Sequence, residues 1–198
     1  MTRIKLCGVR TAADALMCME EGADEIGVVF AVRSRRRVTI EEARIIRDAL
    51  PADVPLVGVF LDAELVEVLR VAKAVGLSAA QLHGTWPARP APLPLYAALQ
   101  VTSEESLRPR PGAARVLLDG PAGGSGKSFP WSLAEKARAL HTGELFVAGG
   151  LTAENVAQAI REAQPTGVDV AGGIENAAGF KDRARVRAFV RAAREADR

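Results

Sequence analysis

The sequence has few of the features that mark a membrane, metal-binding or disulfide-stabilised protein. No apolar run approaches the roughly 20 residues that a membrane-spanning helix needs, and the first residues lead into the short run Ile4–Leu6 rather than into a signal peptide. The two cysteines, Cys7 and Cys18, make no disulfide framework, and no cysteine or histidine cluster has zinc-ligand spacing. We therefore expect a cytoplasmic protein with no structural metal and no membrane partner.

Aromatic residues are also scarce, at 5% of the chain, and the net charge is only +2. The one cluster of arginines, Arg33 with Arg35–Arg37, lacks the interleaved aromatic residues of a nucleic-acid platform. Nucleic acid is therefore not an expected partner. A chain of 198 residues with 48% apolar composition has enough material for one sizeable core, so we expect a single domain over residues 1–198.

Short apolar runs alternate with amphipathic stretches from one end of the chain to the other. The runs are Ile4–Leu6, Glu25–Phe30, Pro55–Phe60, Ala79–Leu82, Leu95–Leu99, Arg115–Leu118, Glu144–Ala148 and Gly167–Val170. Helix N-caps are expected at Thr11, Thr39, Asp62 and Thr152, each before an amphipathic stretch. Eight strands joined by helices predict an α/β fold, a closed (β/α)₈ barrel.

Two of the connections are poor candidates for helices. Residues 85–94 contain four prolines, which remove N–H donors and clash with the preceding turn. Thr102–Gly112 has room for about one turn, from Ser103 to Leu107, before further prolines. We expect the helices after the fourth and fifth strands to be shortened or replaced by loops.

A glycine turn occurs twice near the C-terminus, in Val147–Leu151 and in Val170–Ile174. Glycine permits a positive φ and leaves backbone N–H groups open to an anion. In (β/α)₈ barrels a phosphate is often bound by the loops after strands seven and eight, where these turns would lie. The alternative is that both are tight turns needed only for packing.

Cys7 and Asp119 follow apolar runs, where this fold places its reactive groups. A thiol on the rim next to a helix N-terminus can have a lowered pKa, which suits a general base or nucleophile. Asp119 precedes a glycine-rich segment, and partial desolvation would raise its pKa toward the range of a general acid. Alternatively, Cys7 is a small buried apolar residue, as we expect Cys18 to be, and Asp119 caps a turn.

Three further features lie near the predicted rim. Gly120–Lys127 nearly matches a P-loop, but it has one residue too many between its glycines and Phe129–Trp131 stands where a helix should follow, so we interpret it as a mobile lid. The planar guanidinium of Arg36 suits a substrate carboxylate. His83 is either an active-site residue or the partner in a structural hydrogen bond.

Several short motifs occur in a fixed order over the whole chain. They are Lys5–Arg10, Gly22–Gly27, Ser34–Arg36, Val57–Phe60, Gln81–Gly84, Leu117–Asp119 with Gly123–Gly126, Ala148–Leu151 and Gly167–Val170. In order and spacing they resemble the phosphoribosylanthranilate isomerase family. The resemblance implies a cofactor-free (β/α)₈ enzyme of tryptophan biosynthesis that converts N-(5-phosphoribosyl)anthranilate to 1-(2-carboxyphenylamino)-1-deoxyribulose 5-phosphate by an Amadori rearrangement.

The resemblance also implies roles for individual residues. Asp119 would be the general acid that protonates the furanose ring oxygen, and Cys7 the general base that removes the proton from C2 of the sugar. Arg36 would hold the anthranilate carboxylate, with His83 as a second candidate substrate contact. The phosphate would be bound by Gly124, Ser125, Gly126, Gly149, Gly150, Gly172 and Gly173. The phosphorylated small molecule is the expected partner, and we expect a monomer or a weak homodimer.

The chain departs from the family pattern at three places. Arg35 stands where proline is usual, Gly172 where serine is usual, and a lysine common near the end of the fifth strand is absent from Leu95–Leu99. Two alternatives stay open. The histidine-pathway aminoimidazole carboxamide ribotide isomerase performs the same rearrangement with a carboxylate in place of Cys7. A non-catalytic sugar-phosphate-binding barrel would have no need of Cys7 together with Asp119.

Overall fold

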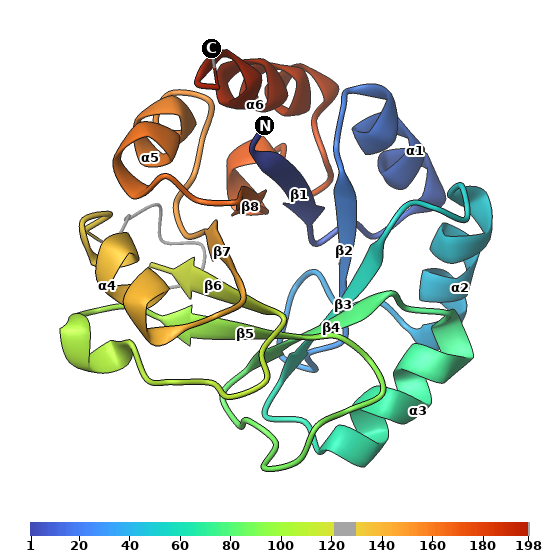
Figure 1. Cartoon of the computed structure of the whole chain (residues 1–198). Helices are drawn as coiled ribbons and strands as arrows, with labels where there is room; N and C mark the ends of the chain where they lie inside the picture. The colour runs from blue at the N-terminus through green and yellow to red at the C-terminus, as the bar shows by residue number, and fades with distance from the viewer. Residues whose placement is uncertain (121–129, 198) are drawn as a thin grey trace.

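The computed structural model describes residues 1–120 and 130–197, in which eight parallel strands form a closed barrel in sequence order (Figure 1). The strands are β1 (Arg3–Cys7), β2 (Glu25–Val29), β3 (Leu56–Leu61), β4 (Ala79–His83), β5 (Leu95–Gln100), β6 (Arg115–Asp119), β7 (Glu144–Val147) and β8 (Gly167–Val170). The barrel closes where β1 pairs with β8, with Lys5 opposite Asp169. The predicted fold class is confirmed, and every expected run overlaps one strand.

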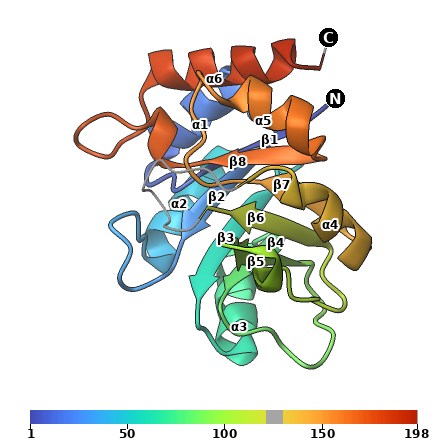
Figure 2. The ribbon, with the colours of Figure 1, turned by 90° about the vertical axis from the view of Figure 1, so that its left-hand side faces the viewer.

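Helices cover the outside of the barrel, with α6 and α3 on opposite sides of it (Figures 1 and 2). They are α1 (Ala12–Glu20), α2 (Ile40–Ala49), α3 (Leu65–Val75), α4 (Leu133–Leu140), α5 (Val156–Ala163) and α6 (Arg183–Glu195), with the 3₁₀ turns η1 (Glu104–Ser106) and η2 (Gly172–Ile174). The connection from β4 to β5, described throughout, contains no helix, and η1 alone follows β5, as the prolines predict. No helix among the described residues is long and apolar enough to cross a membrane.

Two of the four predicted helix caps are confirmed. The Thr11 hydroxyl accepts a hydrogen bond from the Asp14 N–H at 3.1 Å and begins α1. At the start of α2, Thr39 and Glu42 form a reciprocal capping box, each side chain accepting from the other's backbone N–H. These contacts are local in sequence, which is why the spacing reveals them.

The other two predicted caps are wrong. Asp62 adopts a left-handed φ of 49° and donates its N–H to the neighbouring strand β4, so α3 begins later, after Glu64 and without a side-chain cap. The Thr152 hydroxyl accepts instead from the N–H of Glu154, and α5 begins after Asn155. The backbone bends at Asp62 before α3 and makes a turn at residues 153–155 before α5, so both helices start later than expected.

Alternation along the strands separates the barrel into two apolar regions. On β1, Ile4 and Leu6 face outward into the main core beneath the helices, whereas Cys7 lies inside with Val29 and Val59. A second interior cluster is formed by Ala98, Leu117, Phe146 and Ala148. The strands are therefore covered on both faces, as expected for a parallel sheet, and the barrel interior is packed.

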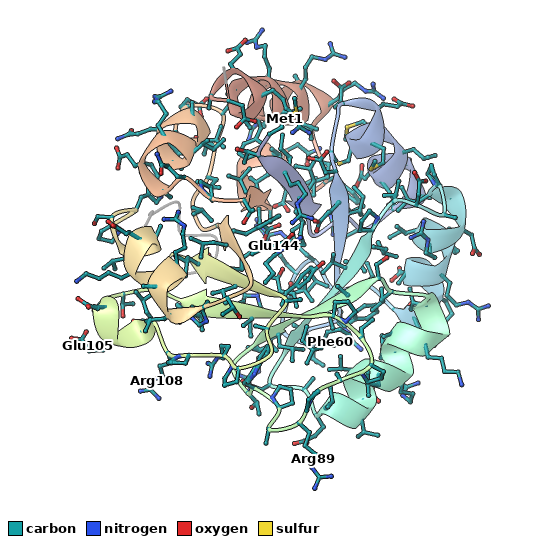
Figure 3. The ribbon with its side chains drawn as sticks, in the orientation of Figure 1. Met1, Phe60, Arg89, Glu105, Arg108 and Glu144 are labelled. Carbon is teal, nitrogen blue, oxygen red and sulfur yellow. The ribbon has the colours of Figure 1, made fainter. Side chains whose placement is uncertain are left out.

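The N-terminal ends of the strands enclose an ion-pair cluster. Arg115 is fully buried and donates to both carboxylate oxygens of Glu25, at 2.7 and 2.6 Å, and to Glu144 at 3.0 Å. Figure 3 shows Glu144 near the centre of the ring of strands, whereas Arg89 and Arg108 extend from its periphery. This end of the barrel is closed by charge pairing and carries no predicted site residue.

Candidate active site

A cavity of about 570 Å³ opens at the C-terminal ends of the strands. Every predicted site residue that the structure describes lines it: Cys7, Arg36, His83, Asp119, Gly149, Gly150, Gly172 and Gly173. The expected lid apart from Gly120, with the candidate phosphate residues Gly124, Ser125 and Gly126, lies outside the described residues. The barrel thus brings together residues from six separate segments of the chain.

Cys7, the last residue of β1, is 6% exposed. Burial raises the pKa of its thiol, and the nearby ammonium of Lys5 opposes that rise. The expectation that a helix N-terminus lowers this pKa is wrong, because α1 begins only at Ala12. Cys18 is a fully buried apolar residue of α1, as expected.

The sequence interpretation missed the buried ion pair beside Cys7. Lys5 Nζ donates to Asp169 Oδ1 at 2.8 Å, and their side chains are 0% and 8% exposed. Both residues occupy strand positions that point into the barrel, which brings them together although they are far apart in sequence. A lysine between Ile4 and Leu6 in an apolar run was the available signal.

Asp119 ends β6 and faces the same cavity. Burial raises the pKa of its carboxyl to about 6, the negative charge of Asp169 acts in the same direction, and the Gly120 N–H and Lys5 oppose it. The expected raised pKa is confirmed. Such a carboxyl is suited to donating a proton near neutral pH.

Arg36 enters the cavity from the loop between β2 and α2. It passes over Gly8, where a Cβ would lie 2.4 Å from the Arg36 Cδ, so the glycine after Cys7 makes room for the arginine. Its Nε and Nη2 donate to the two carboxylate oxygens of Glu175, at 2.5 and 2.9 Å. Glu175 also accepts from Lys181 and from Arg35.

Glu175 and Lys181 are further residues that the sequence interpretation missed. Both are buried, and their backbones form an antiparallel bridge that places them under the Arg36 guanidinium. The position of Glu175 directly after the second glycine turn was the only signal in the sequence. The bidentate pair fixes the orientation of Arg36 before any substrate binds.

His83 ends β4 and lies 3.1 Å, Nε2 to Nε2, from the Gln81 side chain. Burial lowers the pKa of its imidazole, and the positive charge of Lys5 adds to this effect. These effects favour the neutral imidazole, and His83 both lines the cavity and makes a structural hydrogen bond with Gln81. Both expectations for this residue remain compatible with its position.

The two glycine turns use glycine for different reasons. Gly149 and Gly150 have φ values of 79° and 65°, which L side chains rarely adopt. Gly172 and Gly173 do not, but a Cβ on Gly173 would lie 2.0 Å from the carbonyl oxygen of Leu151, in the first turn. The two turns therefore touch one another at the cavity rim. Their glycines are needed for packing, and this need is compatible with binding an anion through the backbone N–H groups.

Comparison with known proteins agrees with this geometry. The family model for N-(5'-phosphoribosyl)anthranilate (PRA) isomerase matches residues 4–192. The chain is 41% identical to N-(5'-phosphoribosyl)anthranilate isomerase of Pseudomonas fluorescens, covering 97% of this chain and 98% of that one. It is 43% identical to the Rubrobacter xylanophilus protein of the same name, covering 98% and 100%.

Solved structures give the same result. Phosphoribosyl anthranilate isomerase from Thermus thermophilus superposes with a TM-score of 0.87 at 35% identity, covering 98% of this chain and 99% of that one. A phosphoribosyl anthranilate isomerase in complex with reduced 1-(o-carboxyphenylamino)-1-deoxyribulose 5-phosphate gives a TM-score of 0.86 at 35% identity, covering 98% and 100%. With the barrel, the cavity and these matches in place, the chain belongs to the N-(5'-phosphoribosyl)anthranilate isomerase family, enzymes of tryptophan biosynthesis.

Proposed function

We propose that Asp119 and Cys7 carry out the proton transfers of the isomerisation in this cavity. Asp119 donates its proton to the furanose ring oxygen as the bond from that oxygen to C1 breaks, and the nitrogen lone pair forms the Schiff base. Cys7, as a thiolate, removes the proton from C2, and the electron pair moves to give an enolamine that tautomerises to the ketone. One general acid and one general base suffice for this reaction.

The observation that carries the proposal is the placement of the two groups. Cys7 and Asp119 are each the last residue of a barrel strand, and both line the same cavity. The surroundings of each residue suit its proposed role as base or acid. The raised pKa of Asp119, about 6, favours the protonated acid, while Lys5 favours the Cys7 thiolate against the effect of burial. A non-catalytic binding barrel would need neither feature.

We assign the ends of the substrate by charge. The Arg36 Nη1 is not engaged by Glu175, whose oxygens take Nε and Nη2, so it is the nitrogen offered to the anthranilate carboxylate. The backbone N–H groups of the Gly149–Gly150 and Gly172–Gly173 turns would bind the phosphate, with Gly124, Ser125 and Gly126 as further ligands. A relative was solved in complex with reduced 1-(o-carboxyphenylamino)-1-deoxyribulose 5-phosphate, a compound that carries both a carboxylate and a phosphate. His83 is the remaining substrate contact.

We further propose a cytoplasmic enzyme that acts without a cofactor and exists as a monomer or a weak homodimer. The related Thermotoga maritima isomerase is described as a dimer from which monomers were generated. Light scattering during size-exclusion chromatography over a range of protein concentrations tests the oligomeric state. A tight complex that persists on dilution would overturn the proposal of a monomer or weak homodimer.

The decisive experiment follows the loss of substrate fluorescence after adding enzyme to freshly made phosphoribosylanthranilate. Cys7→Ala and Asp119→Asn should each lower kcat by roughly 10²–10⁴ with a modest effect on KM, the range usual for acid and base groups. Cys18→Ala is the matched control, because this second buried thiol lies outside the cavity. A Cys7→Ala enzyme within about threefold of wild type would refute the assignment of the base.

A further inference from the structure

Lys5 and Asp169 form a buried ion pair beside the cavity. Its two charges lie 2.8 Å apart inside the barrel, on neighbouring positions of β1 and β8. Removing charges from water is costly, and an apolar pair of similar volume would often stabilise a fold as well or better. A buried pair in an active-site cavity therefore calls for a functional reason.

Lys5 and Cys7 occupy one shared space. They are two residues apart on β1, so both side chains point into the barrel. Gly27 on β2 lies opposite Cys7 in register, and a Cβ there would be 2.8 Å from Cys7 Sγ and 3.0 Å from Lys5 Nζ. Because Gly27 has no side chain, the thiol and the ammonium share the space beside it, and the positive charge of Lys5 acts on the thiol.

Asp169 faces the other reacting group. It lines the cavity together with Asp119, and its negative charge acts directly on that carboxyl. Both charges of the pair act on both groups, but Lys5 has the larger effect on the thiol and Asp169 the larger effect on the acid. The positions of the two charges are fixed by the strand register and by the hydrogen bond within the pair.

We propose that Lys5 and Asp169 are a positioning pair that holds the base and the acid in opposite protonation states, with Lys5 favouring the Cys7 thiolate and Asp169 the Asp119 carboxylic acid. This inference rests on the proposed roles of Cys7 and Asp119. The reaction needs both states at once. The fraction of enzyme that has them changes about tenfold for each unit by which the two pKa values move relative to one another.

Other charged groups also face the two sites. Lys181, in the loop before α6, and Arg36, in the loop after β2, act on Cys7. Both are engaged by Glu175, and Lys5 has the largest opposing effect on the thiol. Asp119 is otherwise influenced by Lys5 and the Gly120 N–H. Burial and Lys5 both lower the pKa of His83, which disfavours a positive charge on it.

The pH dependence of Cys7 alkylation by iodoacetamide tests the coupling directly, in a Cys18→Ala background so that Cys7 alone reacts. Lys5→Met should raise the pH at which alkylation is half-maximal, the midpoint, by about one to three pH units. Lys5→Arg should keep the midpoint near its wild-type value, because the effect depends on an adjacent positive charge. Asp169→Asn should move it downward, because it removes a negative charge from the same thiol. Lys73→Met, an exposed lysine of α3, should leave it unchanged.

Opposite shifts from the two members of one ion pair would not arise from a merely structural role, which moves both variants in one direction. An unchanged midpoint in Lys5→Met, or shifts of the same sign, would overturn the inference. If circular dichroism shows that Lys5→Met does not fold, the test depends on Asp169→Asn alone. A downward shift of its alkylation midpoint supports the pair's role, and the absence of that shift refutes it. Alkylation requires no turnover, so activity retained by Cys7→Ala would refute the proposed function separately.

Discussion

At the scale of single residues, the proposed acid Asp119 lowers the stability of the fold when it is ionised. Asp119 is buried near another carboxylate, and its pKa of about 6 in the fold stands above the ordinary value of 3.8. The folded protein therefore holds this proton more tightly than the unfolded chain. Stability is lost as the pH rises from the unfolded pKa through the folded one, so the ionised acid destabilises the fold at neutral pH.

Asp119→Asn should therefore stabilise the protein while it removes activity. At about pH 8 the gain in the free energy of unfolding should be about 1–3 kcal/mol, and it should shrink toward about pH 3, where the wild-type carboxyl is largely protonated in both states. Urea unfolding at the two pH values measures the difference. A gain that is equal at both pH values would show that ionisation is not its cause.

Arg36 should bind the substrate as a specific clamp. Arg36→Met should weaken binding of a reduced product analogue by about 1.5–3 kcal/mol, the value of a charge-assisted hydrogen bond. Glu175 keeps Lys181 and Arg35 as partners, so the fold should persist. Arg33→Met is the control, since Arg33 is exposed and outside the cavity. Equal losses by calorimetry would indicate a diffuse basic patch.

At the scale of elements, the two glycine turns form one rim. If they bind phosphate, inorganic phosphate should slow alkylation of Cys7 and raise the Tm by mass action. Gly173→Val should abolish both effects, because any Cβ there meets the Leu151 carbonyl and separates the turns. Circular dichroism should confirm that the variant still folds.

Gly172→Ser is the matched variant in the same turn. Gly172 does not have a positive φ, and the nearest atom to an added Cβ, Arg36 Nη2, is 3.3 Å away, so a small shift accommodates the serine. Its hydroxyl should tighten phosphate binding by about 0.5–1.5 kcal/mol, one net hydrogen bond. A phosphate-soaked crystal with the anion bound elsewhere would contradict the assignment of both turns.

At the scale of the whole molecule, stability and chemistry lie at opposite ends of the barrel. Arg115 begins β6 and Asp119 ends it, so one strand contributes to the closed ionic end and to the reactive end. Arg115 also lies over the ring of Phe146, with its Cζ 3.6 Å from the ring centroid. Both ends are buried, but only the reactive end faces a cavity with the predicted site residues.

Arg115→Met should therefore cost stability and spare the chemistry. Glu25 would keep only the more distant ion pair with Arg3, at 3.7 Å, so the free energy of unfolding should fall by up to about 3–5 kcal/mol. Arg70→Met, which breaks an exposed pair with Glu67, should cost about 0.5 kcal/mol or less. Denaturant unfolding measures both, and kcat per folded molecule should stay near wild type. Equal stability losses would show that the buried cluster has no special role.

The sequence by itself determined the architecture and most of the rim. Apolar runs, local caps such as Thr39 with Glu42, and prolines act through neighbouring residues, so their spacing predicts the strands, two helix starts and the two reduced connections. Because parallel strands present their C-terminal ends on one face, the residues after each run could be placed together before any coordinates. Cys7, Asp119 and the glycine turns follow from that rule alone.

Only the tertiary structure decided the electrostatics. Lys5 meets Asp169, and Arg36 meets Glu175, across segments far apart in the chain, and no periodicity encodes such pairs. The pKa of the Cys7 thiol is also decided by the tertiary structure. Burial raises it and Lys5 opposes the rise, whereas the sequence suggested that a helix N-terminus would lower it. Charge interactions depend on distance and burial in the closed barrel, whereas the pattern of strands depends on local chemistry, and this difference separates what could be predicted from what could not.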